Sequence, residues 1–347
     1  MEFRTECIIP AATLPQLSIR RPVILVGSCF SDNIARKMRE SLWRAFNPGG
    51  ALYNPLSVAA ALRMLLLDDD ESRFVGSIVE VEEAGRRLVH SMMFDSSMSS
   101  RSREGVVRNF RLRRDEARRL MEEGADLIVT FGTSIAYFED NGAGPVGNCH
   151  KLPSSRFVRR MLEIGEICDE WTRLVGELRD VYGEFNIVIT ISPIRHVRDG
   201  LPTNSLSKAM LRVAVDRLVG RLASAYYFPA FELLTDDLRD YRFYAADMVH
   251  PSDVAVEYIW DKFRNACLSD ADRAMLRRAE GVARLASHRS IIEPTPEEAR
   301  QRRSDIARRF AEVRREWPDC LDLPGGVDDA ADDDPIADVR GDKAGRS

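Results

Sequence analysis

Three polar residues, Ser28, Asp247 and His250, have the types and spacing that nucleophilic catalysis needs. Ser28 follows Gly27 at the end of an apolar run, where a tight strand-to-helix turn would expose its hydroxyl. Backbone N–H groups at the start of that helix could bind a developing oxyanion. The alternative is that Ser28 only caps the helix, which is a common role of serine at such a position.

Asp247 and His250 stand three residues apart, so the carboxylate could hold the Nδ1–H of the imidazole. Pro251 disfavours helical geometry at His250 and suits the first position of the following helix. His250 is therefore expected on a loop at a helix N-terminus, as a neutral base. Ser28, His250 and Asp247 would then form a nucleophile, a base and an orienting group, although a lone D-x-x-H motif is often structural.

Apolar runs that alternate with helical stretches predict the elements that bring these residues together. Three runs rich in Val and Ile are expected to be buried parallel strands, at 22–27, 126–132 and 186–192. A weaker run at 226–234 contains Pro229, which favours an edge strand or a strand end. The stretches with helical period are 32–42, 56–67, 114–123, 155–182 and 205–223. This alternation predicts an α/β fold with ligands at the carboxyl ends of the strands.

Two further regions lie outside this alternation. The segments 74–81 and 87–94 indicate a β-hairpin, within an excursion at 73–94. Thr295, Pro296 and Glu298 form a capping signal for a charged helix that runs to about Trp317. We expect an N-terminal segment at 1–20, a domain at 21–268, a helical extension at 269–317 and a disordered acidic tail at 318–347.

Composition restricts the class of protein. Fifty Lys and Arg against 55 Asp and Glu give a net charge of −5, which argues against nucleic-acid binding through whole-chain charge. No apolar run reaches the length of a membrane-spanning helix, and the first residues lack the pattern of a signal peptide. Six scattered cysteines fit a reducing compartment. A soluble cytoplasmic protein with no nucleic-acid or membrane partner is expected; oligomeric state is not indicated.

Several motifs together resemble the GSCFA-domain family. VILVGSCFSDNIARKM resembles its signature, with Ser31 where the motif has Ala. The other motifs are NPGGALYNPLS, TFGTSIAYF, GNCHKLP, ITISPIRHVRDG, NSLSKAML and FELLTDDLRDYRFYAADMVHPS, in order from about residue 20 to 265. The family is similar to the SGNH/GDSL hydrolases, which implies a flavodoxin-like three-layer α/β/α sandwich. It also implies ester-type acyl chemistry, with Ser28 as nucleophile and Asp247 and His250 completing a triad.

The oxyanion donors depart from the SGNH pattern, which normally adds a Gly and an Asn. Ser134 stands where Asn is expected after Gly132. Asn148 could provide the missing amide, although an Asx turn is an equal alternative. The candidate donors are therefore Ser28, Gly132 and Asn148, with Gly49 or Gly50 as other sources of a glycine N–H.

Polar residues near the expected strand ends are candidates for substrate binding or for structural roles in loops. They are Asn54, His150, Lys151, Arg195 and His196. A zinc site from His150, His196, His250 and Asp247 is a minor alternative, since no close ligand pair such as H-x-x-x-H supports it. No metal and no cofactor are expected. Cys29 is interpreted as small core filler that points away from the Ser28 side of the turn.

The leading functional hypothesis is a serine-dependent esterase or O-acyltransferase that works through an acyl-enzyme. Its substrate would be a small-molecule or carbohydrate ester, such as an acylated sugar. The second hypothesis, from another class, is a catalytically weak binding protein of the same fold that recognises a glycan or acylated ligand. A reactive probe separates the two, because only the enzyme should be labelled at its nucleophile.

Overall fold

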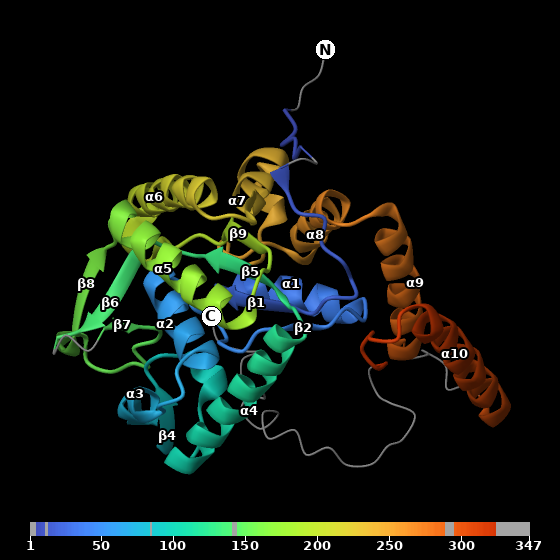
Figure 1. The fold of residues 1–347 in the computed structure, drawn as a ribbon, viewed down its shortest axis with the longest axis horizontal. Coiled ribbons are helices and arrows are strands. Elements are labelled where there is room, and N and C mark those ends of the chain that lie inside the picture. Colours follow the sequence, from blue (N-terminus) through green and yellow to red (C-terminus); the bar gives the residue numbers. More distant parts are fainter. Residues whose placement is uncertain (1–4, 11–12, 84, 141–143, 289–294, 324–347) are drawn as a thin grey trace.

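A five-stranded parallel sheet forms the centre of the molecule (Figure 1). The computed structural model describes residues 5–10, 13–83, 85–140, 144–288 and 295–323. The strands lie in the order β10-β9-β5-β1-β2. Their bounds are β1 Val23–Gly27, β2 Ala45–Phe46, β5 Asp126–Phe131, β9 Ile187–Ile191 and β10 Ala225–Phe228. The three strands expected from Val- and Ile-rich runs are confirmed, and all three are buried along their length.

Helices cover both faces of this sheet, which makes a three-layer α/β/α sandwich. Side chains of β1 alternate between the two faces, with Ile24 and Val26 in one apolar cluster and Val23 and Leu25 in the other. The first face packs against α2 Pro55–Leu66, α4 Arg103–Glu122, α5 Ile164–Tyr182 and α6 Gly200–Arg221. On the second face lie α1 Cys29–Glu40 and α8 Asp253–Cys267, and the same apolar cluster extends outward to α9 Asp270–Ser287 and to α10 Pro296–Glu316, which packs on α9. The α/β prediction is confirmed.

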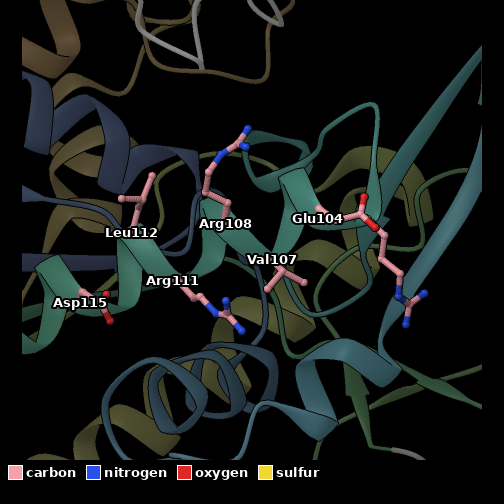
Figure 2. A pocket seen from close by; sticks show the side chains of 7 residues that line it. Glu104, Val107, Arg108, Arg111, Leu112 and Asp115 are labelled. Carbon is pink, nitrogen blue, oxygen red and sulfur yellow. The ribbon is translucent and has the colours of Figure 1, made fainter.

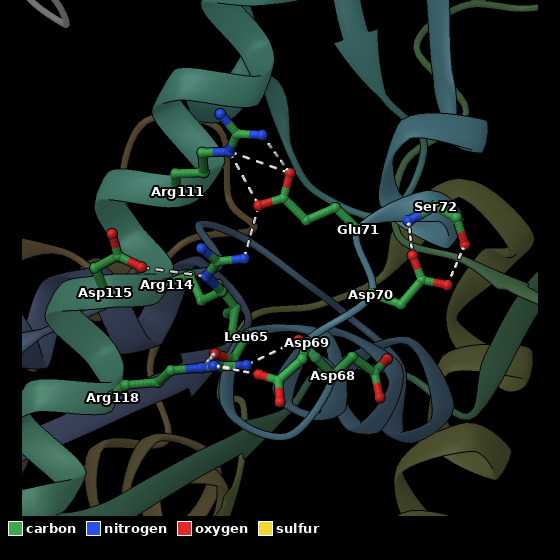
Figure 3. Close-up of polar contacts among 10 residues, drawn as sticks. All are labelled: Leu65, Asp68, Asp69, Asp70, Glu71, Ser72, Arg111, Arg114, Asp115 and Arg118. Carbon is green, nitrogen blue, oxygen red and sulfur yellow. Dashed lines mark hydrogen bonds and ion pairs between the residues drawn. The ribbon is translucent and has the colours of Figure 1, made fainter.

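Charged side chains of α4 bind the loop that follows α2. Glu71 accepts hydrogen bonds from both Arg111 and Arg114, with an Arg114 Nη1 to Oε1 distance of 2.7 Å (Figure 3). Arg118 bonds Asp69 at 2.8 Å and the carbonyl of Leu65 at 3.1 Å (Figure 3). These hydrogen bonds and ion pairs therefore link α4 to the end of α2 and to the loop that follows it, within one helix layer. α4 starts at Arg103, well before the expected residue 114, because Ser102 caps it there with a side chain that accepts from the Gly105 N–H at 3.0 Å.

Two small antiparallel units flank the central sheet. The expected hairpin exists as β3 Ile78–Glu83 and β4 Arg86–Ser91, but its first residues form the short helix α3 Ser72–Gly76 instead. A second unit, β7 Pro145–Val146, β6 Ile135–Glu139 and β8 Phe157–Met161, was not expected. β8 occupies the start of the predicted helix at 155–182. The strand expected at 226–234 ends at Phe228, and helical turns replace its second half, α7 Ala230–Glu232 and η5 Leu233–Leu238.

The C-terminal helices share the apolar core of the second face. The capping signal is confirmed, since Thr295 Oγ1 accepts from the Glu298 N–H while the Glu298 carboxylate accepts from the Thr295 N–H. Trp317 and Cys320 are buried, and the Leu321 N–H donates to Leu42 O at 2.9 Å. The prediction that disorder begins at 318 is therefore wrong for 318–323. The rest of the expected tail, 324–347, lies outside the described residues.

Candidate active site

The carboxyl end of β1 turns sharply into α1. Gly27 has φ +129°, and a Cβ there would lie 2.0 Å from Thr130 O on the neighbouring strand. The backbone can therefore approach this closely only without a side chain. The Ser28 N–H then donates to Thr130 O at 3.1 Å, which fixes the turn at the sheet edge.

Ser28 is the N-cap of α1. Its Oγ accepts from the Phe30 N–H at 3.3 Å, and the residue is 2% exposed. The hydroxyl predicted to be the nucleophile is thus turned onto its own helix. The structure gives Ser28 the capping role that was the alternative to catalysis.

Asp247 and His250 form the expected pair on the loop before α8. His250 Nδ1 lies 2.6 Å from Asp247 Oδ2, while Asp247 Oδ1 accepts from the N–H groups of Val249 and His250 at 2.9 Å each. Met248 adopts φ +57°, which lets the chain curl around the carboxylate. The two backbone hydrogen bonds, and then the imidazole, lower the pKa of Asp247 to about 2. A permanent carboxylate therefore orients His250 and leaves Nε2 as the proton acceptor.

Cys29 is the residue that His250 faces. The Cys29 Sγ lies 3.6 Å from His250 Nε2, so the prediction that this thiol points away from the site is wrong. Burial, followed by the Asp32 carboxylate, raises the pKa of the thiol to about 11. The thiol is therefore neutral near pH 7, and it needs a base at the moment of attack. Cys29, His250 and Asp247 thus contact one another in the order thiol, imidazole, carboxylate, which is the order that a nucleophile, its base and an orienting group require.

The backbone groups proposed as oxyanion donors are already paired. The Ser28 N–H bonds Thr130 O, and the Gly132 N–H donates to Tyr53 O at 2.7 Å. Asn148 forms the alternative Asx turn, since its Oδ1 accepts from the His150 N–H at 2.9 Å. The N–H of Cys29 has a different position. As the first residue of α1 it has no carbonyl partner within the helix, and it lies beside its own sulfur.

Two candidate substrate contacts instead hold loops in place. Asn54 is buried and caps α2, with Oδ1 accepting from the Ser57 N–H at 2.9 Å. His150 is buried, lies 4.3 Å from the stacked ring of His90, and places Nε2 2.9 Å from Ser91 O. Neither side chain is thus available to a ligand in this arrangement. Lys151, the next residue, is exposed.

Arg195 and His196 lie in the loop that follows β9. The Arg195 guanidinium stacks over the rings of Tyr244 at 4.2 Å and Tyr241 at 5.0 Å, and the backbone N–H of Arg195 donates to Val249 O at 3.3 Å. It therefore holds the loop that carries His250. The His196 N–H is bound by Asn204, and burial lowers the pKa of its imidazole.

Sequence reasoning missed one charged residue at this edge, Lys208. It is 3% exposed, and Nζ donates to Gly132 O and Ser192 O at 2.7 Å each. A signal was present, because Asn204, Ser207, Lys208 and Leu211 have the spacing of one buried helix face. Three of these four are polar, which is unusual for a face that packs on a sheet.

A surface pocket of about 410 Å³ lies elsewhere, along the outer face of α4 (Figure 2). It is lined by Arg103, Glu104, Val107, Arg108, Arg111, Leu112 and Asp115. All seven belong to that one helix, so the pocket does not contribute to the Cys29 site. No group of three or more metal-capable side chains occurs among the described residues, and no helix there is long and apolar enough to cross a membrane.

The fold and this site define an α/β protein with a Cys–His–Asp constellation at the carboxyl edge of its sheet. The chain belongs to the GSCFA family, whose family model matches residues 22–263. That match contains β1 through most of α8, and therefore every residue of the constellation. No curated protein and no solved structure matches the chain.

Proposed function

We propose that this protein is an acyl hydrolase or acyltransferase related to the SGNH/GDSL enzymes, with Cys29 as its nucleophile. The observation that carries the proposal is the contact of 3.6 Å between Cys29 Sγ and His250 Nε2, in line with the 2.6 Å contact from Nδ1 to Asp247. The nucleophile differs from the serine expected at first, whereas the base, the orienter and the chemistry are the same.

The chemical steps follow from these positions. His250 Nε2 takes the thiol proton as Sγ attacks the acyl carbonyl carbon, and the oxyanion forms beside the Cys29 N–H. The imidazolium then gives its proton to the leaving alcohol, which produces a thioester on Cys29. Water or an acceptor alcohol, deprotonated by His250, releases the acyl group. The proposed substrate is an ester of a hydroxyl-rich small molecule, such as an acylated carbohydrate.

A pair of adjacent substitutions tests the nucleophile. Cys29→Ala should lower hydrolysis of aryl acetates and butyrates by at least about 10³-fold. Ser28→Ala removes a helix cap, so it should cost about 1 kcal/mol of stability but keep the rate within a few fold. Mass spectrometry of trapped enzyme should locate the acyl group on Cys29, and neutral hydroxylamine should remove it as expected for a thioester.

The opposite pattern would restore the serine hypothesis. Loss of activity in Ser28→Ala, with an acyl group resistant to neutral hydroxylamine, would place the nucleophile at Ser28. If the wild-type protein neither turns over the esters nor forms an adduct, but binds acylated glycans, it is the binding protein considered above.

We also propose a cytoplasmic location. All six cysteines are free thiols, including Cys29 itself, and a set of unpaired cysteines is typical of a reducing compartment. Cell fractionation with the protein in an oxidising compartment would contradict this.

A further inference from the structure

A buried cation lies behind the candidate nucleophile and takes no part in the steps above. The Lys208 ammonium bonds the carbonyls of Gly132 and Ser192, which directly follow the neighbouring strands β5 and β9. It therefore ties two strand ends together on the edge of the sheet where Cys29 and His250 lie.

Gly132 connects this cation to the Cys29 turn. A Cβ added at Gly132 would lie 3.4 Å from Ser28 Cβ and 3.0 Å from Tyr53 O, so the backbone packs directly on the turn. Lys208 is thus separated from the Ser28–Cys29 turn by a single residue. An electrostatic interaction between Lys208 and the Cys29 thiol follows from this placement.

Lys208 opposes the effect of the two carboxylates near Cys29. Asp32 on α1 and Asp247 on the His250 loop both disfavour a negative sulfur, whereas Lys208 favours it. No carboxylate pairs with Lys208 among the residues that the structure describes. A buried ammonium without a counter-ion is costly, and burial lowers the pKa of Lys208 to about 7. Such a cost is typical of functional sites.

We propose that Lys208 is a positioning residue that holds positive charge behind Cys29 and stabilises the anionic sulfur and oxyanion of acyl transfer. This inference rests on the proposed function for its purpose. The inference depends on electrostatic coupling between Lys208 and the Cys29 thiol, which can be measured without any acyl substrate.

The test is the pH dependence of Cys29 alkylation by iodoacetamide, followed by peptide mass spectrometry. Lys208→Gln keeps N–H donors for the two carbonyls but removes the charge, and Lys208→Met removes both. Lys208 is protonated only below its pKa of about 7, so each variant should slow alkylation about tenfold at pH 6. The difference should vanish by about pH 9, where wild-type Lys208 is itself neutral. Unchanged profiles in folded variants would overturn the proposal.

Ser207→Ala is the matched control for a purely structural role. Ser207 lies next to Lys208 on α6, and its Oγ bonds the Ser134 N–H at 2.7 Å and Thr133 Oγ1 at 3.0 Å. Its loss should lower the melting temperature but leave the alkylation profile of Cys29 unchanged. A profile shifted as far as in Lys208→Gln would assign the effect to strand-end packing and refute the role of charge.

A second measurement keeps Lys208 in place, in case both of its variants fail to fold. Cys29→Asp introduces a permanent carboxylate at the thiol position, with Cys29→Asn as its neutral counterpart. The chain has only five lysines, so ¹³Cε-lysine NMR can follow Lys208 individually. Its pKa should be about one unit higher in the Asp variant, because coupling is reciprocal. Equal pKa values in the two variants would refute the coupling.

The two proposals fail in different ways. A shifted alkylation profile without turnover of any ester would support the role of Lys208 in tuning the thiol and contradict acyl transfer. Turnover that depends on Cys29, with alkylation unaffected by Lys208, would support acyl transfer and contradict this inference.

Discussion

Replacement of His250 by Ala should make the reaction depend on the free thiolate. The pKa of Cys29 is raised to about 11, so at pH 8 only about one thiol in 10³ is ionised. In the proposed mechanism this small fraction does not limit the wild-type rate, because His250 would remove the proton during attack. His250→Ala has no such base. Its acylation rate should therefore fall about 10³-fold at pH 8.

The rate deficit of His250→Ala should become smaller as the pH rises. The thiolate fraction grows tenfold for each pH unit below the pKa, so the deficit should shrink to about tenfold at pH 10. Acylation by an aryl acetate, measured as a burst over the rate of Cys29→Ala, gives both values. His288→Ala is a matched control, since His288 is exposed beyond the end of α9 and should have no effect. A deficit that stays constant from pH 7 to 10 would refute the role of His250 as the base.

Three further predictions concern stability. Gly27→Ala should cost about 3 kcal/mol in urea unfolding, because its Cβ would overlap Thr130 O, whereas Gly281→Ala, with open space around it, should cost nothing. A chain ending at residue 317 should melt several degrees below one ending at 323, because it loses buried Cys320 and the bond from Leu321 to Leu42; equal melting would show that 318–323 contribute nothing. The pKa of Asp247 is depressed to about 2, so its ionised form stabilises the fold above about pH 4, and this contribution is lost as pH falls through 2. The difference in melting temperature between wild type and Asp247→Asn should therefore disappear by about pH 2; a difference that persists there would have another cause.

The central sheet was predictable because its strands are buried on both faces and read as continuous apolar runs. The small sheet was not, because β8 has the sequence F-V-R-R-M and exposes its middle residues. Arginine at successive exposed positions is as typical of a helix surface as of an edge strand. The run therefore merged with the true helical period of α5.

Within the site, the local sequence predicted the contacts inside the His250 loop, but it did not predict the contacts between distant segments at the edge of the sheet. The pairing of Asp247 with His250 Nδ1 depends on three residues and one turn, and it is confirmed. The position of Lys208, by contrast, depends on which backbone carbonyls the fold places next to α6. The residues that it bonds lie 76 and 16 positions away in the chain, so spacing alone could not identify them.

The choice between Ser28 and Cys29 shows how a structural preference decides a chemical one. Serine is among the best N-cap residues because its oxygen can accept from a free N–H of the first turn, whereas the sulfur of cysteine is only a weak acceptor. A helix that begins at G-S-C therefore takes Ser28 as its cap and Cys29 as its first residue. The cap turns the hydroxyl back onto Phe30, while the side chain of Cys29, the first helical residue, contacts His250. Helix capping by Ser28 is thus what leaves Cys29, rather than the serine, facing the base.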